Sequence, residues 1–245
     1  MRYLVILILF LGCATGSQED IFGSSVGGEE TYQLIDPNGT YIVKREVKLR
    51  DGKLVTRLRY FAKDGVTPLE NTVAVSRVGT LRTTKELAVL PEAFQYKVWF
   101  EKEEYFSQGK LNPRSRSMGV TVNSPKPEWS GVKDFSLPKA RYICFFSQLP
   151  DCLKIQRLLI KSARQAVNLY VIWDNFPYHK ELYADVGEDL VTMATLKVSG
   201  QEKEEFKFSL DIGSQILFYH YDKNLNFTKM FWVAQGISMI NIEGR

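Results

Sequence analysis

Histidine and cysteine are scarce in this chain of 245 residues, which has two of the first and three of the second. No CxxC pair occurs, and no cysteine or carboxylate stands at metal-ligand spacing from His179 or His220, so no metal site is expected. Each histidine is expected to be partly buried and bonded to backbone. A general base at either position stays open, although no local spacing supplies its nucleophile or its orienting acid.

A strong excess of charge of one sign is also missing. The chain carries 32 Lys and Arg against 28 Asp and Glu, with a net charge of +4, and the two signs are interleaved. Nucleic-acid binders concentrate basic residues in a stripe, so no nucleic-acid partner is expected. Glycine-rich phosphate loops of the P-loop or Rossmann kind are absent as well, and no cofactor is expected.

No apolar run is long enough to cross a bilayer as a helix. The run Leu4–Leu11 has eight residues, which span about 12 Å as a helix against a hydrocarbon core of about 30 Å. Arg2 precedes this run and Gly12-Cys13 follows it at once. This arrangement is typical of a secretory signal peptide, which we expect to cover residues 1–12.

The junction Phe10-Leu11-Gly12-Cys13 resembles the lipobox of bacterial lipoproteins, although Phe10 departs from the Leu usual at its position. The resemblance implies cleavage before Cys13 and attachment to a membrane through acyl chains on this cysteine. Ala14 is similar to the residue found in the outer-membrane class, so the implied location is the cell envelope, on the outer membrane facing the periplasm. The alternative is an ordinary signal peptide that is cut a few residues later.

One motif matches a catalytic pattern by its letters. The stretch Gly23–Gly27 reads GxSxG, but a nucleophile elbow needs a strand before the serine and a helix after it. The residues around it are rich in Gly and Ser, acidic, and without apolar periodicity. We therefore expect the lipidated cysteine and a flexible tether over residues 13–30, not a catalytic serine.

The remainder, residues 31–245, is expected to form a single β-rich domain. Apolar and polar residues alternate in many segments, as in Tyr41–Leu49, Leu54–Phe61 and Phe94–Phe100. Asp51-Gly52 between the first two predicts a hairpin turn. We expect ten to twelve strands in one large, strongly curved antiparallel sheet or half-barrel.

A single helix is expected to pack on this sheet. Pro150 and Asp151 favour a helix start. Ile155, Leu158 and Leu159 fall on one helical face that extends to Ala166. The pattern predicts a helix over residues 151–166 with this face on the apolar side of the sheet.

With Cys13 set aside, two cysteines remain. Cys144 and Cys152 enclose a loop of seven residues, and an exported protein with two such cysteines favours a disulfide. Two buried thiols that behave as small apolar side chains are the alternative.

An export signal, a tether, a curved sheet and a covering helix are together similar in architecture to periplasmic lipid-handling proteins, such as the lipoprotein carrier and receptor of the Lol system. No motif of those proteins matches residue by residue, so no ligand-binding residues follow. The resemblance implies a non-enzymatic lipoprotein that binds an apolar or amphiphilic ligand in a curved-sheet cavity. An envelope scaffold that docks a protein partner is the alternative, and a hydrolase that uses His179 or His220 is a third hypothesis.

Overall fold

A computed structural model of the chain describes residues 28–80, 87–100, 103–140, 142–155, 166–202 and 204–243. The expected signal peptide, Cys13 and the tether up to residue 27 lie outside these residues. Within them, one sheet of 15 strands accounts for most of the structure. The prediction of a mainly β fold with one large, curved, almost wholly antiparallel sheet and a packed helix is confirmed.

The first half of the sheet is a meander in which each strand pairs with the next. Its strands are β1 (Glu29–Asp36), β2 (Gly39–Arg50), β3 (Lys53–Phe61), β4 (Pro68–Thr80), β5 (Leu87–Phe100), β6 (Glu103–Asn112), β7 (Ser117–Asn123) and β8 (Gly131–Ser136). Asp51 and Gly52 join β2 to β3 with φ angles of 53° and 71°, which are the positive values that the Asp-Gly turn predicts.

The second half is another meander. Its strands are β9 (Ile143–Phe145), β10 (Ala166–Ile172), β11 (Val191–Glu202), β12 (Glu205–Ile212), β13 (Gln215–Tyr221), β14 (Phe227–Trp232) and β15 (Ile237–Asn241). The last strand returns to the first, since β15 pairs antiparallel with β1. The short β9 runs parallel to β10. The two halves therefore join at β1 and β15, in the middle of the strand order.

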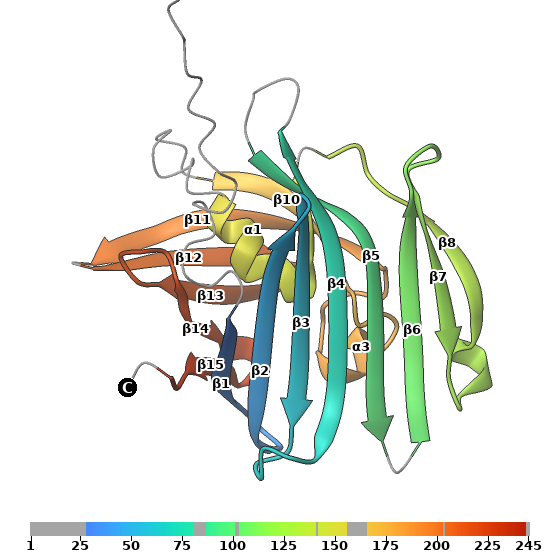
Figure 1. The fold of residues 1–245 in the computed structure, drawn as a ribbon, viewed down its shortest axis with the longest axis horizontal. Helices are drawn as coiled ribbons and strands as arrows, with labels where there is room; N and C mark the ends of the chain where they lie inside the picture. Colours follow the sequence, from blue (N-terminus) through green and yellow to red (C-terminus); the bar gives the residue numbers. More distant parts are fainter. Residues whose placement is uncertain are drawn as a thin grey trace, which may run out of the picture.

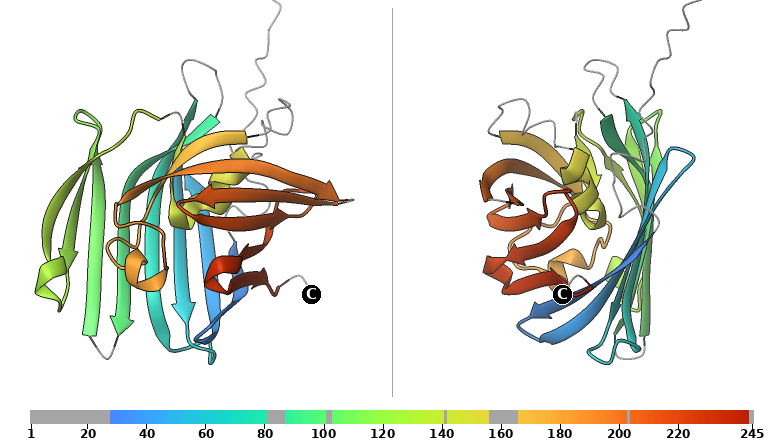
Figure 2. Two further views of the ribbon diagram at one scale, coloured as in Figure 1. Left: turned by 180° about the vertical axis from the view of Figure 1, so that it is seen from behind. Right: turned by 60° about the vertical axis from the view of Figure 1, so that its left-hand side comes forward.

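The two halves face one another as two layers. Figure 1 shows the strands of the second half crossing those of the first, and the right-hand view of Figure 2 shows both layers with α1 (Leu149–Ile155) between them at one end. The outermost strand β9 packs on the inner face of β5, where the rings of Phe145 and Phe94 meet edge to face at 5.8 Å. One continuous sheet thus rolls back on itself and encloses its own core.

The helix is where the sequence pattern was least accurate. α1 begins at Leu149 and not at Asp151, and it continues the 3₁₀ turn η4 (Phe146–Gln148). Ala166 is not helical, because its backbone pairs with Lys197 in the first position of β10. Leu158 and Leu159 fall outside the described residues. None of the described helices is long and apolar enough to span a bilayer.

Three further short helical turns occur in the described residues: η3 (Pro127–Trp129), α3 (His179–Leu182) and η5 (Val233–Gln235). The number of strands exceeds the expected ten to twelve because three short or exposed strands lack a clear apolar pattern. β1 begins at Glu29, inside the predicted tether, β8 is exposed along nearly all its length, and β9 has only three residues.

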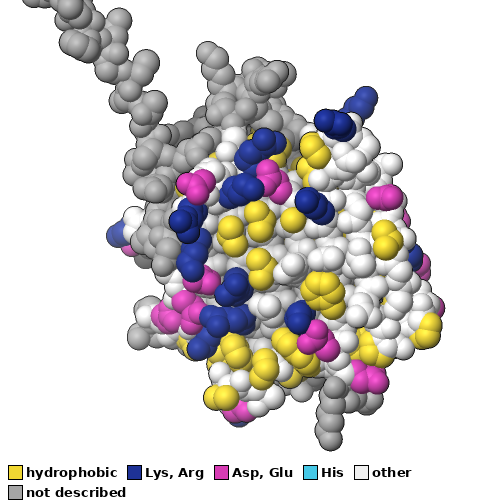
Figure 3. All heavy atoms as spheres, turned by 45° about the vertical axis from the view of Figure 1, so that its right-hand side comes forward, with side chains coloured by type: hydrophobic (Ala, Val, Ile, Leu, Met, Phe, Trp, Pro, Cys, Tyr) yellow, Lys and Arg dark blue, Asp and Glu magenta, His cyan; other side chains and the backbone are white. Residues whose placement is uncertain are grey.

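Alternation along the strands decides which side chains enter the core. On β2, Val43 and Val47 are buried, whereas Lys44 and Glu46 between them face outward. The outer face carries clusters in which one glutamate pairs with two basic side chains. Glu46 pairs with Lys48 and Arg57, Glu92 with Lys53 and Arg77, and Glu29 with Lys44 and Arg59. Figure 3 shows basic and acidic side chains lying side by side on one face of the molecule.

Candidate ligand cleft

An open cleft of about 290 Å³ lies between the inner face of β5 and β6 and the short turns η3 and α3. Its floor is formed by Tyr96, Tyr105 and Tyr178, which make a small aromatic cluster separate from the main core. Its rim is formed by Val98, Phe100, Lys126, Trp129, Glu181 and Leu182. The cleft is thus lined by aromatic and aliphatic side chains with one basic and one acidic residue.

Tyr178 is the centre of the floor. Its ring lies 5.3 Å from that of Tyr105 and 5.2 Å from that of Trp129, both edge to face, and 5.6 Å from that of Tyr96. Each such pair contributes about 0.5–1.5 kcal/mol beyond its buried area. These contacts fix the segment after β10 against the sheet, so the floor is formed before any ligand arrives.

The rim is more open than the floor. Phe100 at the end of β5 is 61% exposed, and Leu182 at the end of α3 is 40% exposed. Both side chains belong to the lining of the cleft, so their exposed apolar surface is available to a ligand. On the η3 side, the ammonium of Lys126 lies 4.1 Å from the centre of the Trp129 ring, in a cation–π contact.

A half-buried carboxyl group lies beside the hydroxyl of Tyr96. The hydroxyl of Tyr96 donates a hydrogen bond of 3.0 Å to Glu70. The pKa of Glu70 is raised to about 7, mainly by burial and also by nearby Asp36, while the bond from Tyr96 opposes the shift. Burial and the neighbouring Glu70 hold the pKa of Tyr96 well above its usual value, so its hydroxyl remains a donor.

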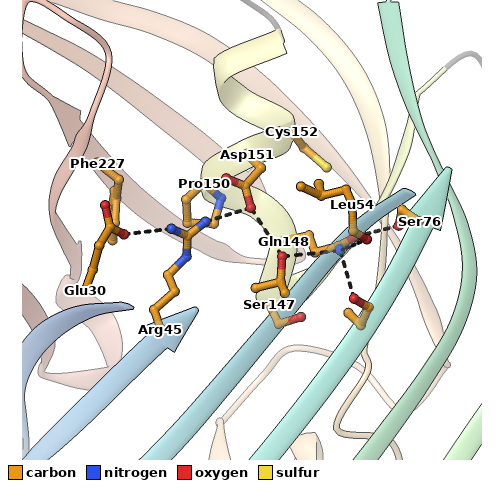
Figure 4. A network of polar contacts seen from close by, with 12 residues as sticks. Glu30, Arg45, Leu54, Ser76, Ser147, Gln148, Pro150, Asp151, Cys152 and Phe227 are labelled. Carbon is orange, nitrogen blue, oxygen red and sulfur yellow. Dashed lines mark hydrogen bonds and ion pairs between the residues drawn. The ribbon is translucent and has the colours of Figure 1, made fainter. Parts of the chain in front are cut away.

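A network of buried polar side chains fixes α1 against the sheet (Figure 4). Arg45 on β2 lies 2.6 Å from Asp151 on α1 and 2.8 Å from Glu30 on β1. Burial alone would lower the pKa of the Arg45 guanidinium, but Asp151, Tyr32 and Glu30 raise it, so this side chain stays charged. The ion pairs position α1 rather than present a group to the cleft, because Arg45 and Asp151 are almost completely buried.

Gln148 extends this network to β3 and β4. Its amide nitrogen donates to the carbonyl oxygens of Leu54 at 3.3 Å and Ala74 at 3.1 Å, and its amide oxygen accepts a bond of 2.5 Å from Ser76. A side chain with both donor and acceptor groups is needed at this position. The turn η4 is therefore held to two strands at once.

The two cysteines of the predicted disulfide lie on and next to α1. Cys144 on β9 and Cys152 on α1 form a disulfide, with their Cα atoms 6.5 Å apart. The bond connects the outermost strand to the helix. It does not border the cleft.

The histidines occupy different environments. His179 is completely buried, with its ring stacked on those of Trp173 at 5.2 Å and Phe176 at 5.7 Å. Burial lowers the pKa of His179 to about 4, although the nearby backbone of Gly187 opposes this shift. His220 instead lies with Nδ1 3.2 Å from a carboxylate oxygen of Glu205. Burial lowers the pKa of His220, although Glu205 opposes this shift.

Among the described residues, neither imidazole is hydrogen-bonded to a serine or cysteine side chain. The hydroxyl of Ser147 instead donates a hydrogen bond to the carboxylate of Asp174. The described residues also contain no group of three or more His, Cys, Asp or Glu that could hold a metal ion. Neither histidine lines the cleft.

The sequence patterns predicted some of the residues that line the cleft but not the others. The alternation of Phe94–Phe100 placed Tyr96 and Val98 on one face of a strand, as the structure has them. Lys126, Trp129 and Tyr178 come from loops without periodicity, so only the fold brings them together. Arg45 gave a usable signal, since it is the one charged residue on the inner face of β2.

Fold and cleft together define a class of protein: a rolled, open β-sheet with an aromatic cleft on its inner face. No protein-family model matches the chain, and no curated protein matches it. Among solved structures, it is similar to a beta-barrel-like protein of a domain of unknown function, DUF1849, from Brucella abortus. The two are 13% identical with a TM-score of 0.49, over 87% of this chain and 93% of the other.

Proposed function

We propose that this protein is a lipid-anchored protein of the cell envelope that binds a small apolar or amphiphilic molecule in the cleft between β5, β6, η3 and α3. The observation that carries the proposal is the composition of the cleft. Seven of its nine lining side chains are aromatic or aliphatic, and its two charges stand at the rim. Ligand sites for small molecules have this character, with a mostly apolar wall and few polar groups.

The size of the cleft limits the ligand. Its volume of about 290 Å³ is just below the range of about 300–1,000 Å³ that is typical of drug-sized ligands. A single hydrocarbon chain or ring system suits this volume better than a lipid with two acyl chains. The proposed membrane anchor depends on the lipobox-like sequence that ends at Cys13.

Native mass spectrometry of the purified full chain, with Cys13→Ser to keep it out of the membrane, tests the binding proposal. A co-purifying molecule should be present, and Val98→Trp should remove it by filling the cleft. Gln108→Trp is the matched control, since Gln108 is exposed on β6 and lies outside the cleft. A molecule that stays bound to the Val98→Trp variant would refute the assignment of the cleft.

A second candidate function is a scaffold that docks an envelope protein at the same place. The exposure of Phe100 and Leu182 at the rim favours it, since apolar anchors of a partner could insert there. The two functions differ in the free protein. A scaffold should purify with an empty cleft, and added short-chain amphiphiles should not bind to it.

A further inference from the structure

The two charges at the rim of the cleft are not equivalent. Lys126 contacts the ring of Trp129 at the rim of the cleft, and among the described residues no ion pair joins its ammonium to a carboxylate. An ammonium has three hydrogen-bond donors, and a contact with a ring face leaves these donors available. The cleft therefore presents a positive charge at its rim, next to its apolar wall.

The same contact disfavours a cationic ligand. Tryptophan offers the best ring face for binding a cation, and Lys126 already covers the face of Trp129 at 4.1 Å. A ligand ammonium would have to displace this lysine and would meet its charge. Glu181, the other charged residue in the lining, belongs to a different element, α3, so the two charges come from separate parts of the rim.

We infer that the cleft binds a single-chain amphiphile with an anionic head, of the fatty-acid type, whose carboxylate pairs with Lys126 while its chain lies on the floor of Tyr96, Tyr105 and Tyr178. This inference rests on the proposed function and gives the class of ligand for the same site. A charge-assisted hydrogen bond between ammonium and carboxylate is among the stronger polar contacts. The exposed side chains of Phe100 and Leu182 extend the apolar surface beyond the floor.

Three ten-carbon probes that differ only in their head group test the inference: decanoate, decanol and decyltrimethylammonium. Binding to the full chain with Cys13→Ser is measured by isothermal titration calorimetry below the concentration at which the probes form micelles. Decanoate should bind about tenfold more tightly than decanol, as expected for a hydrogen bond between charged groups. Decyltrimethylammonium should bind more weakly than either.

Variants at the rim assign the preference to one residue. Lys126→Met should reduce decanoate affinity to that of decanol, and Lys126→Arg should retain the preference. Lys133→Met is the matched control, since Lys133 is an exposed lysine on β8 outside the cleft, and it should leave decanoate as tightly bound as in the parent chain. Circular dichroism of each variant checks that the fold is retained.

The outcomes separate this inference from the proposed function. Equal binding of decanoate and decanol, or tighter binding of the cationic probe, would overturn the anionic head and leave the apolar cleft standing. A loss of decanoate binding in Lys133→Met as large as that in Lys126→Met would assign the preference to overall charge instead of the rim, and would also overturn it. Failure of all three probes to bind would refute the proposed function itself.

Discussion

The guanidinium of Arg45 on β2 lies 2.6 Å from the carboxylate of Asp151 on α1, and both side chains are only 2% exposed. This contact joins residues 106 positions apart in the chain, so it depends on the rolled sheet being complete. Removing one partner of a buried ion pair leaves the other charge without compensation. The pair is therefore a sensitive reporter of how α1 is held on the sheet.

Arg45→Met should lower the free energy of unfolding by about 3–5 kcal/mol, because it leaves the buried carboxylate of Asp151 without its cation. Urea denaturation followed by tryptophan fluorescence measures this loss. The double variant Arg45→Met/Asp151→Leu should recover part of it, since an apolar pair can replace a buried ion pair. A cost below about 1 kcal/mol in the single variant, the range of an exposed pair, would contradict the buried contact.

Arg45 also shows where sequence reasoning fell short. The alternation of β2 correctly assigned Val43 and Val47 to the core, and the turn at Asp51-Gly52 was correctly located. These features are local, because a strand repeats every two residues and a hairpin turn needs positive φ. Arg45 stands on the same buried face, and its partner on α1 cannot be deduced from local spacing.

The cleft shows the same limit more strongly. Its floor combines Tyr96 and Tyr105 from strands with Tyr178 from the segment after β10, which the rolling of the sheet carries onto β5 and β6. The short strand β9 was not predicted, because three residues are too few to show an alternation of apolar and polar side chains. Local periodicity thus predicted the class of fold, whereas the site depends on contacts between segments that are distant in sequence.

The disulfide gives a second test of the region around α1. Thiol labelling of the denatured, unreduced protein should find neither Cys144 nor Cys152 free. Because the loop between them is short, reduction should cost about 2–3 kcal/mol of stability by the chain-entropy model. Quantitative labelling of both cysteines before reduction would contradict the bond.

The pH dependence of stability should contain a contribution from Glu70. Its pKa is raised from 4.5 to about 7 in the folded protein, so in this window the folded state holds a proton that the unfolded chain releases. This contribution is fully present below pH 4.5 and is lost as the pH rises through about 7. Glu70→Gln should flatten this fall, as measured by urea denaturation at several pH values between 4.5 and 8.

The contribution of His179 to stability changes with pH in the opposite direction, so it must be separated from the contribution of Glu70. Its pKa is lowered from 6.5 to about 4, so its contribution is present above pH 6.5 and is lost as the pH falls through about 4. In the Glu70→Gln variant the acid side of the profile should therefore become steeper. An unchanged profile would show that the pKa of the Glu70 carboxyl is not raised in the folded protein.

The membrane anchor is tested at Cys13. Cys13→Ser should move the protein from the membrane fraction to the soluble fraction of the cell envelope, because the acyl chains that hold it can no longer be attached. Fractionation followed by a carbonate wash and immunoblotting measures this. A variant that remains as firmly bound to the membrane as the parent chain would show that lipidation is not the anchor.

The rolling of the sheet can be tested at Gly109 on β6. This glycine pairs directly with Phe94 on β5, and the Phe94 ring lies over it, so an added Cβ would overlap ring carbons. Phe94 is only 2% exposed, and its ring contacts Phe145 of β9 on its other side. The ring has little room to move, since it lies between the sheet and the strand that packs on its inner face.

Gly109→Ala should therefore lower stability by about 1–3 kcal/mol, the usual cost of overpacking a core. Gly79→Ala is the matched control, because Gly79 lies on β4 with no heavy atom within 4 Å of an added Cβ. Its stability should be unchanged or slightly raised, since alanine reduces the freedom of the unfolded chain. In a Phe94→Leu background, which removes the ring, Gly109→Ala should cost less than it does alone. An equal loss of stability from Gly109→Ala in the two backgrounds would mean that β9 does not hold the Phe94 ring over the glycine. The two halves of the sheet would then contact one another in a different way.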